Sequence, residues 1–348
     1  AIGPGPKAEI RCCIDKERAI LQDRIKMAMG GDRNNPNPVE VIDIACDECP
    51  AEGVMVTAAC RGCMVHACQD VCPKGAISIV NHRAVVDKDK CVECGKCAKA
   101  CPYSALIMQH RPCMISCKVK AISIDEDKKA KIDNEKCISC GACVYKCPFG
   151  AITDKSYVLD IIDMLRQSEN NSKYRVYAVI APAIVSQCRF GRPTQVVTAI
   201  HKLGFHQVVE AALGADITLY NEALEWKEKG LMTTSCCPSY VAFIEKNFPE
   251  LVPLISHSVS PMIMTAQLIK HSDPTAKVVF IGPCASKKFE FKLEKTGGAI
   301  DSVMSFEELQ AFLDARGIDT VECEDTVLDH ASFYGRIFAK SGGIVQGL

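Results

Sequence analysis

Two cysteine runs with the same spacing constrain the fold of this chain more than any other feature. The first is Cys91-x2-Cys94-x2-Cys97-x3-Cys101-Pro, and the second is Cys137-x2-Cys140-x2-Cys143-x3-Cys147-Pro. Three thiolates in a tight loop can wrap one side of a [4Fe–4S] cube, and the fourth thiolate must then come from elsewhere. The spacing therefore predicts [4Fe–4S] clusters, with zinc or free thiols as the alternative for each loop.

A rule of two-cluster ferredoxin modules assigns the remaining ligands. The cysteine before proline in such modules binds the other cluster. The rule predicts three sets of four: Cys91, Cys94 and Cys97 with Cys72; Cys60, Cys63 and Cys68 with Cys101; and Cys137, Cys140 and Cys143 with Cys117. The segment Ala-Ile-Ser-Ile recurs after both Cys72 and Cys117. We therefore expect two ferredoxin-like units in tandem.

The second unit lacks counterparts of Cys60 and Cys63. Its spare cysteines and an upstream Cys-x2-Cys pair form one possible set, which is Cys46, Cys49, Cys113 and Cys147. That set predicts either a fourth cluster or a zinc site. Cys12 and Cys13 are adjacent and cannot easily both bind one metal ion, so we expect buried or free thiols there.

Cysteine usage also indicates the compartment. Of the 23 cysteines, 18 lie between Cys12 and Cys147, but the chain is too long for a disulfide scaffold. Reduced thiols in the cytoplasm are the better interpretation. The net charge of −1 gives no reason to expect nucleic acid, and no apolar run is long enough to cross a membrane.

Secondary-structure signals divide the chain into three parts. Residues 1–50 are expected to form a helical segment that carries a Cys-x2-Cys pair, residues 51–155 the tandem ferredoxin-like domain, and residues 156–348 an α/β domain. In the last part, strands expected at 176–180, 208–209 and 277–281 alternate with helices expected at 193–203 and 218–229. Ser305 and Glu308 form a capping box before another helix. This alternation predicts a largely parallel sheet.

Two further cysteine motifs lie where strands of the α/β domain are expected to end. Ser235-Cys236-Cys237-Pro238 follows an apolar strand at 231–233 and opens a helix, whose N-terminus would stabilise a thiolate. Gly282-Pro283-Cys284 follows a second strand. Functional residues often lie at the carboxyl ends of parallel strands. Taken alone, these could equally be buried cysteines of a core.

These motifs resemble those of the iron-only, or [FeFe], hydrogenase family. Thr234-Ser235-Cys236-Cys237-Pro238 is similar to its first signature motif, and Pro283-Cys284-x-x-Lys287-x-x-Glu290 to its second. Shorter similarities are Ala181-Pro182-Ala183, Leu203-Gly204-Phe205, Gly214-Ala215-Asp216, Tyr334-Gly335-Arg336 and Ser341-Gly342-Gly343. The cysteine-rich half, with its broken second unit, resembles the clostridial-type group B. The resemblance covers nearly the whole chain.

The resemblance implies an active centre in which a [4Fe–4S] cube is bridged through a cysteine to a diiron unit that carries CO and cyanide. It implies that Cys237 and Cys284 ligate the cube, Cys236 passes protons and Lys287 hydrogen-bonds a cyanide. It also implies proton-path roles for Glu222 and Glu225, with Ser256 between them and the thiol, a place near the cluster for Glu290, and cofactor contacts from Ala181 and Pro182. Without the resemblance, the three glutamates would be interpreted as solvated surface charges.

The sequence departs from the family pattern at three places. No match to the third signature motif, which supplies two more cysteines, follows Cys284; only Cys323 does. We interpret this as C-terminal truncation and expect the fragment alone to be inactive. Gly282 replaces a common Met, which predicts a more open diiron pocket, and Met262 replaces a common Gln.

The sequence thus predicts ferredoxin-like α+β cluster modules followed by an incomplete α/β iron-hydrogenase domain. The intact protein is expected to be a cytoplasmic enzyme of anaerobes that interconverts dihydrogen with protons and electrons. Three or four [4Fe–4S] clusters would relay electrons to a ferredoxin-like carrier, with no nucleic acid or membrane partner. The alternatives are a hydrogenase-like redox or dihydrogen sensor and an electron-transfer protein without a diiron centre.

Overall fold

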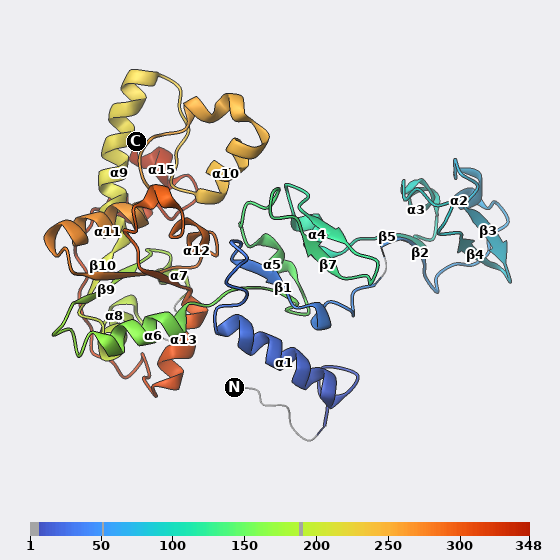
Figure 1. The fold of residues 1–348 in the computed structure, drawn as a ribbon. Helices are drawn as coiled ribbons and strands as arrows, with labels where there is room; N and C mark the ends of the chain where they lie inside the picture. The colour runs from blue at the N-terminus through green and yellow to red at the C-terminus, as the bar shows by residue number, and fades with distance from the viewer. Residues whose placement is uncertain (1–6, 51, 188–190) are drawn as a thin grey trace.

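The computed structural model describes residues 7–50, 52–187 and 191–348. Figure 1 shows a small unit at one end, a second small unit in the middle and a larger α/β domain at the other end. The domain boundary expected at 50/51 adjoins residue 51, which lies outside the described residues. None of the helices in the described part is long and apolar enough to span a bilayer.

The first unit occupies residues 52–109 without interruption. Strand β2 (Gly53–Val56) pairs antiparallel with β5 (Leu106–Gln109), and β3 (Ile77–Val80) forms a hairpin with β4 (Arg83–Val86). Two short helices, α2 (Ala67–Asp70) and α3 (Lys96–Ala100), carry cysteines. Its small core is closed by Val54, Ile77 and Leu106.

The second unit repeats this plan with a discontinuous chain. Strand β1 (Val39–Val41) pairs antiparallel with β8 (Ile152–Asp154), as β2 pairs with β5, and β6 (Ile122–Ile124) pairs with β7 (Ala130–Ile132). The one-turn helix η1 (Asp43–Ala45) follows β1, and α4 (Pro112–Ser116) and α5 (Ala142–Lys146) are the short helices. Residues 39–49 therefore belong with residues 111–155, and the first unit is inserted between them.

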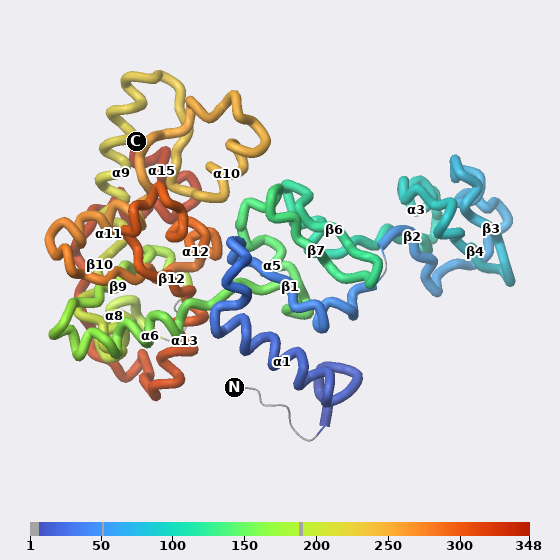
Figure 2. Tube along the Cα trace, viewed as in Figure 1, coloured from blue at the N-terminus to red at the C-terminus, as the bar shows by residue number. Residues whose placement is uncertain are grey.

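This nesting differs from the tandem order and the boundary expected from the sequence. A three-residue strand such as β1 is too short to be recognised by its alternation. The inserted unit begins and ends at one place, because Gly53 lies opposite Gln109 in the β2–β5 pair. Figure 2 shows the chain entering and leaving the first unit through these two strands.

The N-terminal helix α1 (Ile14–Ala28) matches the helix expected there, and the chain turns at Gly30 and Gly31, both with positive φ. Its buried side chains are Ile20 and Met27, whereas Ile25 is exposed. The helix covers the core of the second unit, which includes Val39 and Ile152.

The α/β domain contains a four-stranded parallel sheet in the order β10-β9-β11-β12. Its strands are β9 (Val176–Ile180), β10 (Gln207–Glu210), β11 (Lys277–Ile281) and β12 (Ser302–Met304), and β9 and β11 coincide with strands expected from the sequence. The segment expected as a strand at 231–233 makes only an isolated bridge from Thr233 to Ile255.

Helices cover both faces of this sheet (Figure 1). One layer contains α9 (Ala211–Lys229) and α11 (Pro261–Ser272), and the other contains α6 (Val158–Gln167), α8 (Pro193–Lys202) and α13 (Phe306–Ala315). The capping box forms as expected, since Ser305 Oγ accepts from Glu308 N–H and the Glu308 carboxylate accepts from Ser305 N–H. The remaining elements are α7 (Ile184–Gln187), α10 (Pro238–Asn247), η2 (Pro249–Leu254), α12 (Lys287–Glu290), η3 (Glu294–Thr296), α14 (Phe333–Ile337) and α15 (Gly343–Gly347).

Buried polar contacts fix the second unit to the α/β domain. Lys288 is 1% exposed, and its Nζ donates to Asp154 Oδ2 and Glu308 Oε1, each at 2.7 Å. Ser239 Oγ donates to the carbonyl of Ile138 at 2.9 Å. Because buried charges need partners, this interface tolerates little rearrangement.

Candidate functional site

The predicted cluster ligands come together in the first unit. Cys72, Cys91, Cys94 and Cys97 line one cavity of about 330 Å³, open mouth included. Burial raises the pKa of Cys68, and the nearby thiols of Cys101 and Cys63 raise it further. Cys60 packs in the same core as these residues. The crossed assignment of Cys72 and Cys101 to the other loop is thus the arrangement that the fold produces.

The second unit gathers its cysteines into two matching sets. Cys46, Cys49, Cys113 and Cys147 line a cavity of about 300 Å³, nearly the size of the one in the first unit. Burial raises the pKa of Cys143 to about 12, and the thiols of Cys137, Cys140 and Cys117 surround it. The four cysteines for which the sequence predicted either a fourth cluster or a zinc site therefore lie together. Cys12 and Cys13 are exposed and lie outside all of these sets.

Backbone N–H groups point at the cysteine sulfurs in a repeated pattern. An alanine four residues after the cysteine donates to Sγ at 3.2–3.3 Å in the pairs Ala76–Cys72, Ala105–Cys101, Ala121–Cys117 and Ala151–Cys147. Ala84 N–H donates to Cys60 Sγ and Ala130 N–H to Cys46 Sγ, both at 3.3 Å. Ala84 and Ala130 lie in β4 and β7, so Cys46 occupies in the second unit the place of Cys60 in the first.

These donor sets suit an iron–sulfur cube. Hydrogen bonds to cluster sulfurs stabilise the thiolates and set the reduction potential. A zinc ion would need sulfurs about 2.3 Å from a single point. Across the described ranges, no three His, Cys, Asp or Glu side chains are arranged to hold one ion. The two sets that line cavities surround about 330 and 300 Å³, open mouths included.

The α/β domain brings Cys236, Cys237 and Cys284 together at the carboxyl side of the sheet. Cys236 and Cys237 precede α10, and Cys284 follows β11. Burial raises the pKa of Cys236, an effect partly offset by Thr234 and by the positive charge of Lys287. Burial likewise raises the pKa of Cys284, and Lys287 opposes it. One lysine therefore acts on two of the three thiols.

Lys287 is held beside these thiols by a buried partner. Its Nζ donates to Glu290 Oε2 at 2.6 Å and to the carbonyl of Cys236 at 3.1 Å. Glu290 is 6% exposed, so it is not the solvated charge that the sequence alone suggested. The ammonium thus has a carboxylate on one side and faces the cysteine cluster.

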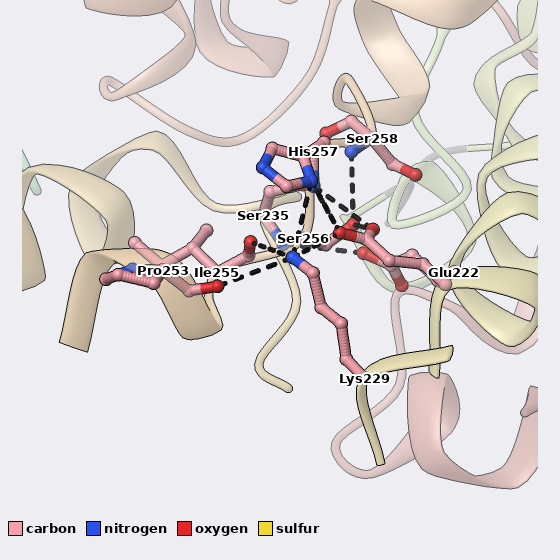
Figure 3. A network of polar contacts seen from close by, with 9 residues as sticks. Glu222, Lys229, Ser235, Pro253, Ile255, Ser256, His257 and Ser258 are labelled. Carbon is pink, nitrogen blue, oxygen red and sulfur yellow. Dashed lines mark hydrogen bonds and ion pairs between the residues drawn. The ribbon is translucent and has the colours of Figure 1, made fainter. Parts of the chain in front are cut away.

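Two carboxylates, Glu222 and Glu225, belong to a polar network that includes the exposed His257. Figure 3 shows Glu222, Ser256 and His257 in this network. Glu222 is fully buried, and its Oε1 accepts from Ser235 N–H at 3.4 Å. Its Oε2 has no hydrogen-bond partner within the described part of the chain. Burial raises the pKa of Glu222, and the Ser235 N–H and the Ser256 hydroxyl offset part of that effect.

Ser256 lies between the two glutamates, whereas the family resemblance implied a place between the glutamates and the thiol. Its Oγ donates to Glu225 Oε2 at 2.7 Å (Figure 3). Burial alone would raise the pKa of Glu225, but hydrogen bonds from Lys229, Ser256 and the His257 N–H lower it to about 2. Lys229 Nζ is 2.6 Å from Glu225 Oε1, and His257 Nδ1 is 2.8 Å from the same oxygen.

His257 and Lys229 were not identified from the sequence. The i,i+4 spacing of Glu225 and Lys229 on α9 was a usable signal for the lysine. His257 offered none, because its approach depends on the loop between η2 and α11.

The space next to Gly282 is filled by the Phe280 ring, while the more open diiron pocket expected from this glycine stays a prediction. A Cβ at this position would lie 2.5 Å from Phe280 Cε1 and 3.2 Å from Ala181 Cβ. The Phe280 ring takes the volume that a side chain at 282 would need. Ala181 and Pro182, expected to contact a cofactor, follow β9 at this edge of the sheet, and Met262 is buried at the start of α11.

A larger cavity opens next to the cysteines. Its volume is about 1150 Å³ to the open mouth, and Ser235, Ser256, Ser260 and Glu290 are among its lining residues. Ser260 Oγ is buried and lacks a hydrogen-bond partner among the described residues. A buried unpaired hydroxyl in this cavity and an unpaired carboxylate oxygen whose charge acts on Cys236 fit a site that receives a polar group.

Family models match both halves of the chain. The model of the iron only hydrogenase large subunit, C-terminal domain, matches residues 174–348. The 4Fe-4S dicluster domain matches residues 59–105, and the 4Fe-4S binding domain matches residues 130–153.

Individual relatives of this chain are named as hydrogenases. Iron hydrogenase 1 of Clostridium pasteurianum is 31% identical over 79% of this chain and 52% of its own length. The periplasmic [Fe] hydrogenase large subunit of Nitratidesulfovibrio vulgaris is 29% identical over 76% of this chain and 66% of its own. A solved structure of the [FeFe]-hydrogenase HydA has a TM-score of 0.44 at 25% identity, covering 49% of this chain and 50% of that one. The chain thus spans about half to two thirds of these relatives.

Proposed function

This chain belongs to the iron-only hydrogenase family, and from that premise we propose that the intact protein interconverts dihydrogen with protons and electrons. The family model accounts for 174–348, the part that contains all three cysteines of the α/β site. The ferredoxin-type models account for most of the cysteine-rich half. The proposal therefore joins an electron relay to a catalytic centre in one chain.

The observation that supports it best is the buried carboxylate beside the thiols. Glu222 is fully buried with one unpaired oxygen, and its negative charge acts on Cys236. From Glu222, Ser256 leads to Glu225, which is hydrogen-bonded to the exposed His257. A protein that only carries electrons has no use for such a row of proton-binding groups, whereas a reaction that consumes protons needs one.

The residues of the chain take separate roles in this proposal. Cys237 and Cys284 would hold the cube, and the attached diiron unit would supply the dihydrogen chemistry when bound. Lys287 would present a partly buried positive charge to anionic ligands at that unit. Cys236 would exchange a proton with Glu222, and Ser256 would link Glu222 to Glu225.

The cluster sets would form the electron path. The set of Cys117, Cys137, Cys140 and Cys143 is nearest to the catalytic domain, because Lys246 Nζ donates to the carbonyl of Cys137 at 2.7 Å. The first unit lies at the far end (Figure 2), where a ferredoxin-like carrier would exchange electrons. We place the protein in the cytoplasm of an anaerobe, since reduced thiols and exposed clusters require a reducing environment.

Dihydrogen evolution from reduced viologen by the anaerobically matured, full-length protein tests the proposal. Cys236→Ala should reduce turnover by about 10² to 10⁴, the range for loss of a proton-transfer group. Its iron content should not change. Cys12→Ala, at an exposed thiol outside every set, is the matched control. Loss of iron in Cys236→Ala would mean that the roles of Cys236 and Cys237 are exchanged.

Infrared spectroscopy separates the alternatives. A hydrogenase or a hydrogenase-like sensor should show bands from carbon monoxide and cyanide, and turnover then distinguishes the two. An electron carrier without a diiron centre should show neither bands nor turnover.

A further inference from the structure

The cysteine set of Cys46, Cys49, Cys113 and Cys147 has a buried cation beside it. Arg111 lines the same cavity and is only 3% exposed. Its Nε and Nη1 atoms are buried and have no hydrogen-bond partner anywhere in the described residues. An unpaired buried guanidinium is costly to bury, so an anion is expected at this site.

We propose that this set binds a [4Fe–4S] cluster whose reduction potential Arg111 raises, so that it is the first cluster of the relay to be reduced. The inference depends on the proposed function only in taking the cysteine sets to be electron carriers. A cube held by four thiolates has a net negative charge, and reduction adds one electron to it. A fixed positive charge nearby stabilises the reduced state more than the oxidised one.

The surrounding carboxylates do not cancel this charge. Asp47 and Glu48 lie between the two N-terminal cysteines, but both are paired with Arg11 and Lys16. Glu52 accepts from the backbone N–H of Arg111 at 3.2 Å. The Arg11 side chain is 5% exposed and lies 5.1 Å from the centre of the Phe149 ring, which also lines the cavity. The three cations and three carboxylates named here balance in number, but only Arg111 lines the cavity itself.

The first unit provides a natural comparison. Arg111 is the N-cap of α4, and the N-cap of the equivalent α2 is His66, which is only half-buried. The cavity of Cys72, Cys91, Cys94 and Cys97 contains one cation, Lys74, whose side chain is exposed. Water screens an exposed charge far more than a buried one. The two cavities thus share thiolates and N–H donors to sulfur but differ in buried positive charge.

The place of this cysteine set in the electron path determines what a higher reduction potential would do. Arg111 follows β5 by two residues, at the junction of the two units, whereas residues 138–141 contact the catalytic domain. Electrons from the first unit would therefore reach this cluster before the one next to the catalytic domain. A station of higher potential here would store one electron taken from the external donor, with no proton exchanged.

The test is a redox titration of the full reconstituted chain, followed by electron paramagnetic resonance with dithionite as reductant. Arg111→Met should lower the reduction equilibrium constant of one cluster at least tenfold, which is about 59 mV for a one-electron couple. Arg111→Lys keeps the charge and should keep most of that potential. Lys74→Met, the matched control at the exposed cation, should change its cluster less than threefold. Cys49→Ala should abolish the signal that moves, together with about four irons.

Each outcome of these experiments either supports or overturns the proposal. Loss of about four irons in Arg111→Met but not in Arg111→Lys would also support the proposal, because charge is then what the site requires. Equal effects of Met and Lys, or no shift in Arg111→Met at full iron content, would overturn it. Wild-type protein with about twelve irons, or with zinc at this set, would overturn the inference and leave the hydrogenase proposal in place.

Discussion

The two ferredoxin-like units have the same internal geometry but different chain paths. In the first, one continuous segment supplies every cysteine, strand and N–H donor. In the second, Cys46 and β1 come from before the inserted unit and the rest from after it. The N–H of Ala130 nevertheless meets Cys46 as that of Ala84 meets Cys60. A cluster module therefore requires ligands and donors in the right places and does not depend on their order in the chain.

The units also differ in how firmly they are held. The first touches the rest of the chain near β2 and β5, whereas Lys288 and Ser239 fix the second to the catalytic domain. Burial differs accordingly: it raises the pKa of Cys113 to about 11 and that of Cys143 to about 12. We infer that the first unit is a separable module and that the second is part of the catalytic body.

Removal of the first unit should have the largest effect on cofactor content. Because Gly53 and Gln109 are paired, residues 52–110 can be replaced by a short Gly-Ser linker that joins nearby ends. We expect loss of about eight irons, two cubes, with the remaining clusters retained. Iron and acid-labile sulfide analysis measures this directly.

A chain that begins at residue 52 is the matched control. It keeps the first unit but removes β1, Cys46 and Cys49, so the second unit should lose about four irons and unfold at lower temperature. If excision of 52–110 instead empties the second unit as well, the two units are interdependent and the nested description fails.

Lys288→Met should produce the next largest effect. It leaves Asp154 and Glu308 without their shared cation at the interface of the second unit. Breaking a buried ion pair from one side costs about 3–5 kcal/mol. Lys90→Met, in the first unit, removes an exposed pair with Asp87 and should cost less than about 1 kcal/mol. Denaturant unfolding of both variants compares the two environments, and equal losses would contradict the difference in anchoring.

Much of this architecture could be predicted from the sequence, because regular patterns lie close together in the chain. The Cys-x2-Cys-x2-Cys loops, the strands at 176–180 and 277–281, and the capping box at Ser305 are all local signals. The nesting could not be predicted, because β1 has three residues and its partner β8 begins 111 residues after β1 ends, at Ile152 against Val41.

The site residues that belong to family motifs could be predicted from the sequence. Those that only tertiary contacts bring to the site could not. Cys236, Cys284 and Lys287 lie together, as the resemblance implied. Arg111 and His257 carry no motif, and only packing makes the first buried and unpaired and brings the second to Glu225. The Phe280 ring over Gly282 was equally hidden, since its direction depends on the sheet.

In the cluster-free folded protein, the difference in burial should appear as a difference in the alkylation rates of individual cysteines. The Ala84 N–H lowers the pKa of Cys60 and the Ala76 N–H that of Cys72, whereas burial raises those of Cys113 and Cys143. Only the thiolate reacts. At pH 9, pKa values of about 11 and 12 leave roughly one thiol in 100 and one in 1,000 ionised, so Cys113 and Cys143 should be alkylated at least about 50-fold more slowly than Cys60 and Cys72. Cys68 and Cys97 of the first unit, whose pKa burial also raises, should react more slowly than Cys60 and Cys72.

Mass spectrometry of partly alkylated protein gives the rates for each cysteine. The difference in alkylation rate between Cys60 and Cys143 should narrow as the pH rises toward 11, because a raised pKa delays ionisation without preventing it. Similar rates for Cys60 and Cys143 at pH 9 would show that both units open equally in solution.

The smallest predicted effect compares two equivalent glycines. Gly95 and Gly141 are the N-caps of α3 and α5, with φ of 70° and 75°. Alanine at either position costs about 1–2 kcal/mol, because a Cβ is unfavourable at such φ. At Gly95 the new Cβ would meet only the flexible Met108 side chain at 3.4 Å, but at Gly141 it would lie 3.2 Å from Ala285 Cβ, next to Cys284. Gly141→Ala should therefore cost about 1 kcal/mol more in denaturant unfolding, from overpacking against the catalytic domain. Equal costs would mean that Ala285 can move away. The contact between the second unit and the Cys284 loop would then be looser than firm anchoring of the second unit to the catalytic domain requires.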